Sequence, residues 1–145
     1  MQAIEILLNH PQEYANDEGL PGSFEEVYRF HQSMDEYRQT PLHPLRALAA
    51  RLHVKGLYVK DESHRFGLNA FKGLGVSYAL HEIIKQHPQE AYTFVSCTDG
   101  NHGRALAWRA HQLGHKAIIF MPKGSELRRV RAIEQHQATV IVTEQ

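Results

Sequence analysis

Apolar residues recur at helical spacing in two segments of the N-terminal part of the chain. Between residues 23 and 40 they lie three or four positions apart, and Ser23 with Glu26 forms a capping box, so the pattern predicts a helix there. Pro44 suits the first position of a helix, and the apolar residues after it predict a second helix that ends before Gly56. Both predicted helices precede the part of the chain where most strands are expected.

From residue 57 the pattern changes to a regular alternation of short apolar runs and amphipathic stretches. The β-prone runs at 57–60, 93–97, 116–121 and 139–143 predict strands, and the segments between them carry apolar residues at helical spacing. The third run is apolar on both faces, as expected of a strand buried between helices. This β-α-β-α-β-α-β order predicts an α/β fold, with a mostly parallel sheet, right-handed crossovers and helices on both faces.

The two ends of the chain differ from this regular middle. Residues 1–22 are interrupted by proline and glycine, and we expect them to form an N-terminal arm outside the packed region 23–145. The last predicted strand is followed by two residues, although an open parallel sheet usually continues until both faces are covered. We therefore expect the chain to be truncated at the C-terminus.

Composition and charge exclude several classes of protein. Of the 145 residues, 42% are hydrophobic and 22% are charged, as in an ordinary soluble globular domain. Sixteen basic residues balance sixteen acidic ones, so charge favours neither a nucleic acid nor an anionic membrane as a partner. The single cysteine, Cys97, cannot form an internal disulfide and falls in a strand that we expect to be buried. Without a signal peptide or an apolar span, we expect a cytoplasmic protein.

Lys72 is the first candidate for chemistry. It follows Asn69, a candidate helix N-cap, and it lies beside Gly73 and Gly75, which leave room for a flat group near the backbone. A lysine amine attacks a carbonyl only when it is unprotonated, and partial burial favours that neutral form. The alternative is an ordinary solvated lysine, because most lysines lie at the surface.

A second candidate segment, residues 96–104, lies between a predicted strand and a predicted helix. In open α/β sheets ligands bind at this carboxyl end of a strand, and the free N–H groups of the helix start would hold a carboxylate or a phosphate. Asp99 is a candidate general base, Asn101 can donate and accept hydrogen bonds, and His102 is a polar contact or a proton carrier. The alternative is a plain turn, for which Asp-Gly-Asn is also suitable.

These two segments resemble those of one enzyme family. The sequence Ala-Phe-Lys-Gly-Leu-Gly at residues 70–75 resembles the segment of fold type II pyridoxal-phosphate enzymes whose lysine carries the cofactor as an imine. Thr-Asp-Gly-Asn-His-Gly-Arg at 98–104 resembles diaminopropionate ammonia-lyase, because related dehydratases and synthases usually have serine where Asp99 stands. The later Phe-Met-Pro-Lys-Gly-Ser at 120–125 also fits, and the resemblance covers residues 23–145.

The resemblance implies elimination of ammonia from 2,3-diaminopropionate to give pyruvate and a second ammonia. It implies that Lys72 holds pyridoxal 5'-phosphate, that Asp99 or the released lysine removes the α-proton, and that Asn101 hydrogen-bonds the ring oxygen of the cofactor. Gly100 and His102 would belong to the loop that grips the carboxylate of this small amino-acid substrate. Family members are homodimers and are considerably longer. Their glycine-rich phosphate loop, second catalytic acid and partner of the pyridine nitrogen lie beyond this C-terminus, so the activity of this chain alone stays open.

Other functions are weighed against this resemblance. Two stay open: another fold type II enzyme, such as a threonine or serine dehydratase, and a non-catalytic fragment of the family. A dinucleotide site is not expected, because Gly73-Leu74-Gly75 is followed by Tyr78 where a third glycine would stand. Eleven histidines are present, but they form no metal-binding motif, so no metal site is predicted.

Overall fold

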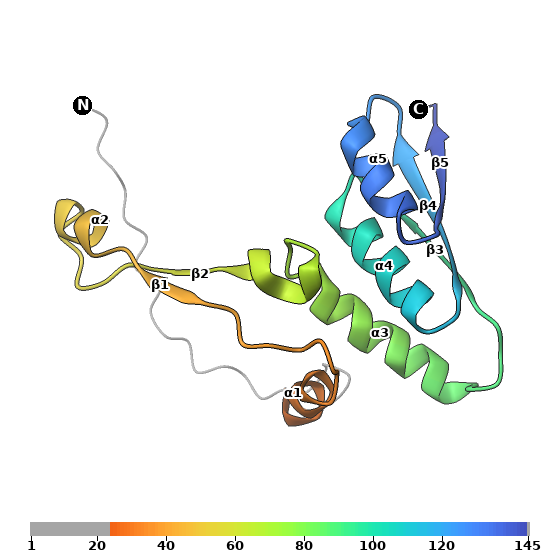
Figure 1. Ribbon diagram of the computed structural model, residues 1–145, viewed down its shortest axis with the longest axis horizontal. Coiled ribbons are helices and arrows are strands. Elements are labelled where there is room, and N and C mark those ends of the chain that lie inside the picture. Colours follow the sequence, from red (N-terminus) through yellow and green to blue (C-terminus); the bar gives the residue numbers. More distant parts are fainter. Residues whose placement is uncertain (1–23, 145) are drawn as a thin grey trace, which may run out of the picture.

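The computed structural model describes residues 24–144, so Ser23 and the predicted arm over residues 1–22 lie outside the described part (Figure 1). The elements are the helices α1 (Phe24–Gln32), α2 (Arg46–Arg51), α3 (Lys72–Gln86), α4 (Asn101–Gln112) and α5 (Leu127–Glu134), the 3-10 helix η1 (Glu62–Gly67), and the strands β1 (Leu42–Pro44), β2 (Tyr58–Lys60), β3 (Thr93–Cys97), β4 (Lys116–Pro122) and β5 (Thr139–Thr143). No described helix is both long and apolar enough to cross a membrane.

The centre of the fold is a three-stranded parallel sheet in the order β3-β4-β5. The α/β class and the parallel sheet are therefore as predicted. Each strand is added on the same side of the previous one, so successive right-handed crossovers place α4 and α5 on one face (Figure 1). In the described residues the other face has no helix, and Val95, Cys97 and Ile141 are exposed there. The prediction of a buried Cys97 is wrong, because burial of that face needs a second layer of elements.

The predicted strand at 57–60 does not join the parallel sheet. It forms β2, which pairs antiparallel with β1 in a separate two-stranded sheet, and this sheet extends away from α3 and β3 (Figure 1). Strand β1 was missed, since three residues that end in a proline carry no readable alternation. Pro44 closes β1 instead of opening a helix, and α2 begins at Arg46.

The predicted helix cap at Asn69 is also wrong. Asn69 has φ 54°, in the left-handed region, and α3 begins only at Lys72 with no side-chain cap. Ser125 donates its hydroxyl to the carbonyl of Pro122, 2.7 Å away, and leaves α5 without a side-chain cap. The Ser125 hydroxyl thus bonds within the turn before the helix, which is a common alternative for short polar residues. Helix α4 ends at Gln112, and Gly114 follows two residues later with φ 76°, which is typical of a glycine that stops a helix.

Helix α1 is shorter than its apolar spacing predicts. It ends at Gln32, and the Ser33 hydroxyl donates to the carbonyl of Phe30 at 2.7 Å. A few residues on, the guanidinium of Arg38 donates to two backbone carbonyls of the same turn. Such local side-chain bonds offer the backbone an alternative to the helix.

The core lies between α4 and the sheet. Alanines at 105, 107 and 110 on α4 are buried, and Ile119 and Met121 of β4 and Ile133 of α5 are fully buried. Gly103 allows the close approach, since a Cβ there would lie 2.3 Å from Thr98 Cγ2 and 2.8 Å from Ile119 Cγ2. The start of α4, where the candidate chemistry lies, is therefore held directly on the sheet.

Candidate active site

All five predicted site residues lie around one hollow of about 730 Å³. The hollow lies at the carboxyl end of β3, and its lining comprises Asn69, Lys72, Thr98, Asp99, Gly100, Asn101, His102, Arg104, Arg128, Arg129 and Ala132. The segment before α3, the first turn of α4 and α5 thus meet at one place. Their individual roles stay predictions, but the structure brings the lysine and the aspartate together.

Lys72 lies where two surfaces of different character meet. It is the first residue of α3, and its amine lies 5.2 Å from the centre of the Phe71 ring. Beyond the polar hollow it also lines an apolar groove of about 450 Å³, together with Val76, Leu80 and Phe94. The side chain of Lys72 is exposed, so the partial burial that the sequence led us to expect is not present in the described residues.

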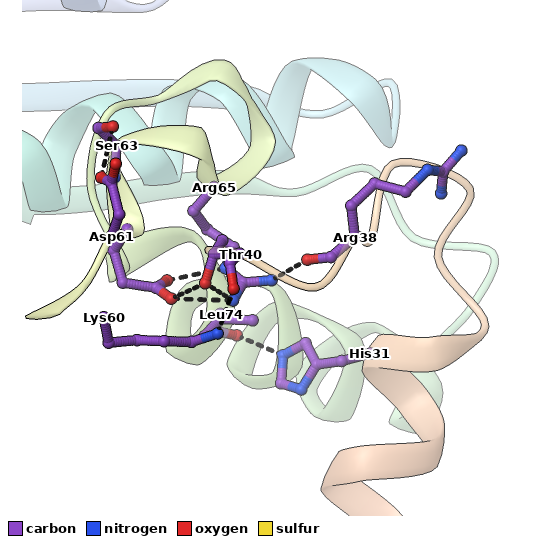
Figure 2. A network of polar contacts seen from close by, with 9 residues as sticks. His31, Arg38, Thr40, Lys60, Asp61, Ser63, Arg65 and Leu74 are labelled. Carbon is purple, nitrogen blue, oxygen red and sulfur yellow. Dashed lines mark hydrogen bonds and ion pairs between the residues drawn. The ribbon is translucent and has the colours of Figure 1, made fainter. Parts of the chain in front are cut away.

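The segment that leads to Lys72 is anchored by a buried guanidinium. Arg65 is only 4% exposed, and it donates from Nε to Glu62 Oε2 at 2.8 Å and from Nη1 to the carbonyl of Arg38 at 2.8 Å. Glu62 also accepts a hydrogen bond from the Thr40 hydroxyl at 2.6 Å. Figure 2 shows Arg65, Thr40 and Lys60 converging from three segments. The hydrogen bond from Arg65 holds the pKa of Glu62 below its ordinary value.

The chain turns sharply between this anchor and the lysine. Phe66, Gly67 and Asn69 have φ values of 53°, 67° and 54°, which place three residues of four in the left-handed region. On the far side of the turn, His31 Nε2 lies 2.8 Å from the carbonyl of Leu74, which ties α3 to α1 (Figure 2). The backbone on both sides of Lys72 is thus fixed by contacts with distant segments.

The other half of the site is the start of α4. No side chain caps this helix, so the N–H groups of its first turn are free of a side-chain partner. Gly100 precedes the helix, and its N–H donates to the Thr98 hydroxyl at 3.1 Å. A helix start of this kind carries a positive dipole end and suits a carboxylate or a phosphate.

Asp99 is held from the opposite wall of the hollow. Its carboxylate lies 3.4 Å from Nη1 of Arg129, which also donates to the carbonyl of Asp99 at 3.2 Å. Both side chains are at least half exposed, so this ion pair is a weak one. Asp99 is therefore oriented toward the hollow without being locked there.

The hollow has an excess of positive charge. Lys72, Arg104, Arg128 and Arg129 line it, and Asp99 is the only carboxylate among its lining residues. The sequence had pointed to none of these arginines as site residues, because α5 carries no motif and Arg104 was read only as part of one. An anionic ligand is favoured in such a site. Among the described residues, no group of three His, Cys, Asp or Glu side chains could hold a metal ion.

This chain resembles known proteins both in sequence and in structure. A family model described as pyridoxal-phosphate dependent enzyme matches residues 34–145. Diaminopropionate ammonia-lyase of Salmonella typhimurium is 43% identical across 82% of this chain and 34% of its own length. The crystal structure of diaminopropionate ammonia-lyase from Escherichia coli in complex with D-serine superposes with a TM-score of 0.80 at 45% identity, over 82% of this chain and 35% of that one.

A more distant relative is the L-threonine dehydratase of Haemophilus influenzae, 33% identical over 71% of this chain and 19% of that protein. The chain spans about one third of the length of the two ammonia-lyases it matches. The family model covers well over half of the chain, and the parallel sheet and its helices superpose on a member of known structure. The chain therefore belongs to the pyridoxal-phosphate dependent enzymes of fold type II.

Proposed function

We propose that this chain carries the cofactor lysine of a pyridoxal-phosphate dependent ammonia-lyase that acts on 2,3-diaminopropionate. The observation that carries the proposal is that Lys72 and Asp99 line one polar hollow at the carboxyl end of a parallel strand. The likeness to diaminopropionate ammonia-lyases of Salmonella typhimurium and Escherichia coli supports the choice of substrate. The chain spans about a third of those proteins, so the activity of the whole enzyme is part of the proposal.

The residues around the hollow fit pyridoxal 5'-phosphate. An aromatic ring matches the apolar groove beside Lys72, and the polar hollow next to it leaves the uncapped start of α4 for the carboxylate of a bound amino acid. Lys72 would hold the cofactor covalently, and Asn101 would hydrogen-bond its ring oxygen. When bound, the cofactor supplies an electron sink for the pair of electrons left at the α carbon of the substrate.

The protein residues then have distinct tasks. The start of α4 with Gly100 and His102 binds the substrate carboxylate, and Asp99 or the released amine of Lys72 takes the proton from the α carbon. The bond between the β carbon and its nitrogen breaks, and ammonia departs. With one water, 2,3-diaminopropionate gives one pyruvate and two ammonia molecules. The negative charge of Asp99 also suits a substrate with two amino groups.

The first experiment tests the lysine. The purified chain is mixed with pyridoxal 5'-phosphate, reduced with borohydride and digested, and mass spectrometry locates the labelled residue. We expect the label on Lys72 and its loss in the variant Lys72→Ala. Lys85, an exposed lysine on the same helix, gives the matched control Lys85→Ala, which should keep the label. A folded chain that is labelled at random or not at all would contradict the proposal.

The second experiment tests the substrate. With 2,3-diaminopropionate we expect pyruvate and ammonia in a ratio of one to two, whereas serine would give them in equal amounts and threonine would give 2-oxobutanoate. Turnover of threonine alone would favour the dehydratase alternative, which the likeness to the Haemophilus influenzae enzyme supports. A chain that is labelled at Lys72 but turns over nothing would favour the non-catalytic fragment.

Two broader expectations accompany this proposal. The resemblance to the family favours a homodimer for the longer protein, which analytical ultracentrifugation would test. The single thiol, Cys97, is free and exposed, and this supports the cytoplasm as the compartment because reducing conditions keep exposed thiols free. Both stay predictions.

A further inference from the structure

Arg104 joins the two halves of the candidate site. It lies in the first turn of α4, five residues after Asp99, and its guanidinium reaches back to the loop before Lys72. Nη1 donates to the carbonyl of Leu68 at 3.1 Å, and Nη2 approaches the carbonyl of Gly67 at 3.5 Å. One side chain thus connects the helix that follows Asp99 with the loop that precedes Lys72.

The loop needs such a partner because of its backbone. With Phe66, Gly67 and Asn69 all in the left-handed region, it cannot continue the hydrogen bonding of η1 into α3. Trp108 lies one turn beyond Arg104 on α4, and its ring stacks on that of Phe66 with 5.0 Å between centroids. Residues four apart on a helix share a face, so Arg104 and Trp108 hold the same loop together.

Arg104 contacts the loop as a cation without an ionic partner in the described part of the chain. The guanidinium is partly buried, its Nε has no hydrogen-bond partner, and no ion pair among the described residues includes it. Burying a charge against neutral carbonyls only is unfavourable compared with pairing it. Arg65, the other arginine near this loop, has a carboxylate partner.

We infer that Arg104 is a positioning residue that fixes the separation between Lys72 and Asp99. The first turn of α4 sets the distance from Arg104 to Asp99, and the bonds to the loop set the distance from Arg104 to the start of α3. This inference rests on the proposed function, in which both side chains act on one ligand. It concerns the placing of the lysine and not the chemistry of the arginine itself.

The test compares two arginines of one helix. Arg104→Met removes the bonds to the loop, and Arg104→Lys keeps a cation that can reach one carbonyl. Arg109→Met is the matched control, because Arg109 is also partly buried with an unpartnered Nε, but among the described residues its guanidinium bonds to Gln112 and lies over the Trp108 ring instead of bonding to the loop. Each variant is measured for its rate of labelling at Lys72 with pyridoxal 5'-phosphate, for the pH midpoint of that labelling, and for its melting temperature.

We expect Arg104→Met to slow labelling of Lys72 by about 10- to 100-fold, the cost of a misplaced reacting group, with partial recovery in Arg104→Lys. Arg109→Met should lose melting temperature yet be labelled at the rate of the unchanged chain. Equal rates in Arg104→Met and the unchanged chain would overturn the inference, as would equal slowing in both methionine variants. Failure of the unchanged chain to label at Lys72 would instead overturn the proposed function.

Hydrogen exchange measured without cofactor separates failure of this inference from failure of the proposed function. In Arg104→Met we expect the amides of residues 66–69 to exchange with deuterium faster, while those in the middle of α4 keep their protection. Unchanged exchange in the loop would overturn the inference whatever the cofactor does. Faster exchange throughout α4 would also overturn it, because Arg104 would then stabilise the whole helix and not the placing of the loop.

Discussion

The two halves of the site are fixed in different ways. The segment before Lys72 is held by polar groups that are buried within the protein, with Arg65 bonded to Glu62 and to a backbone carbonyl. The segment around Asp99 is held by two contacts. Gly103 packs closely on the sheet, and Asp99 forms an exposed ion pair with Arg129. Buried polar networks are costly to disturb, whereas exposed pairs contribute little.

This difference gives the two side chains different freedom. The backbone that carries Lys72 is set by contacts within the protein, which suits the covalent bond to a cofactor that we propose for this residue. The backbone of Asp99 is equally fixed, but its carboxylate can leave Arg129 at little cost and turn to a substrate. That freedom would suit Asp99 if it is the base in the proposed reaction.

The largest expected effect comes from removing the buried guanidinium. Arg65→Met removes the cationic partner of Glu62 and the donor to the carbonyl of Arg38, and we expect a loss of about 3 kcal/mol in the free energy of unfolding measured in urea, as for other broken buried pairs. Arg38→Met is the control, since its exposed guanidinium bonds only to neighbouring carbonyls and its loss should cost about 0.5 kcal/mol or less. Equal losses of unfolding free energy in Arg65→Met and Arg38→Met would show that the segment before Lys72 has no special anchor.

The next effect concerns the packing below Asp99. Gly103→Ala places a methyl group against Thr98 and Ile119, and we expect it to lower the free energy of unfolding by about 1–3 kcal/mol. Gly75→Ala is the matched control, because Gly75 is also within a helix but has no atom within 4 Å of an added Cβ. There we expect a gain of about 0.5–1 kcal/mol from helix propensity. A tolerated alanine at 103 would contradict the close packing.

Acid should selectively weaken the contacts that hold the segment before Lys72. The pKa of Glu62 is held below its ordinary value of 4.5 by Arg65, so above 4.5 the carboxylate is charged in both states and the stabilisation is complete. As the pH falls below 4.5 the unfolded chain takes up the proton first, and stability is lost until the folded protein is protonated too. Urea unfolding between pH 6 and 3 measures this. In Glu62→Gln the free energy of unfolding should decline less steeply as the pH falls. The same slope as in the unchanged chain would contradict the assignment of this pH dependence to Glu62.

The smallest effect is expected at the exposed pair. Arg129→Gln should change the free energy of unfolding by about 1 kcal/mol or less, because both side chains are at least half in water. The free energy of unfolding of this variant should no longer carry the salt dependence that the ion pair confers, and unfolding at low and high salt would test this. A loss as large as that of Arg65→Met would remove the contrast between the two halves.

Much of the fold and the site followed from local patterns. The alternation after residue 57 predicted the helices α3, α4 and α5 and the parallel strands between them. Residues 70–75 and 98–104 were identified as the segments of chemical interest. These features are local, because helix and strand periodicity and turn residues act over a few neighbouring positions.

The errors also have a common cause. Asn69 was predicted to cap a helix, and Pro44 to open one, because each suits that position when only its neighbours are considered. Contacts with distant segments decided otherwise: Arg104 reaches the loop that contains Asn69, and the residue after Pro44 bonds to Leu57. Local preference is worth less than such tertiary contacts.

The sequence alone therefore identified the candidate residues, since an amine, a carboxylate and a free helix start are properties of short segments. Only the tertiary structure decided that they meet at one hollow, and that Arg65, Arg104 and Arg129 hold them there. The partners of these arginines include the backbone carbonyls of Arg38, Leu68 and Asp99, each 27 to 36 positions away. A carbonyl is common to every residue, so no sequence pattern marks the one that an arginine will find.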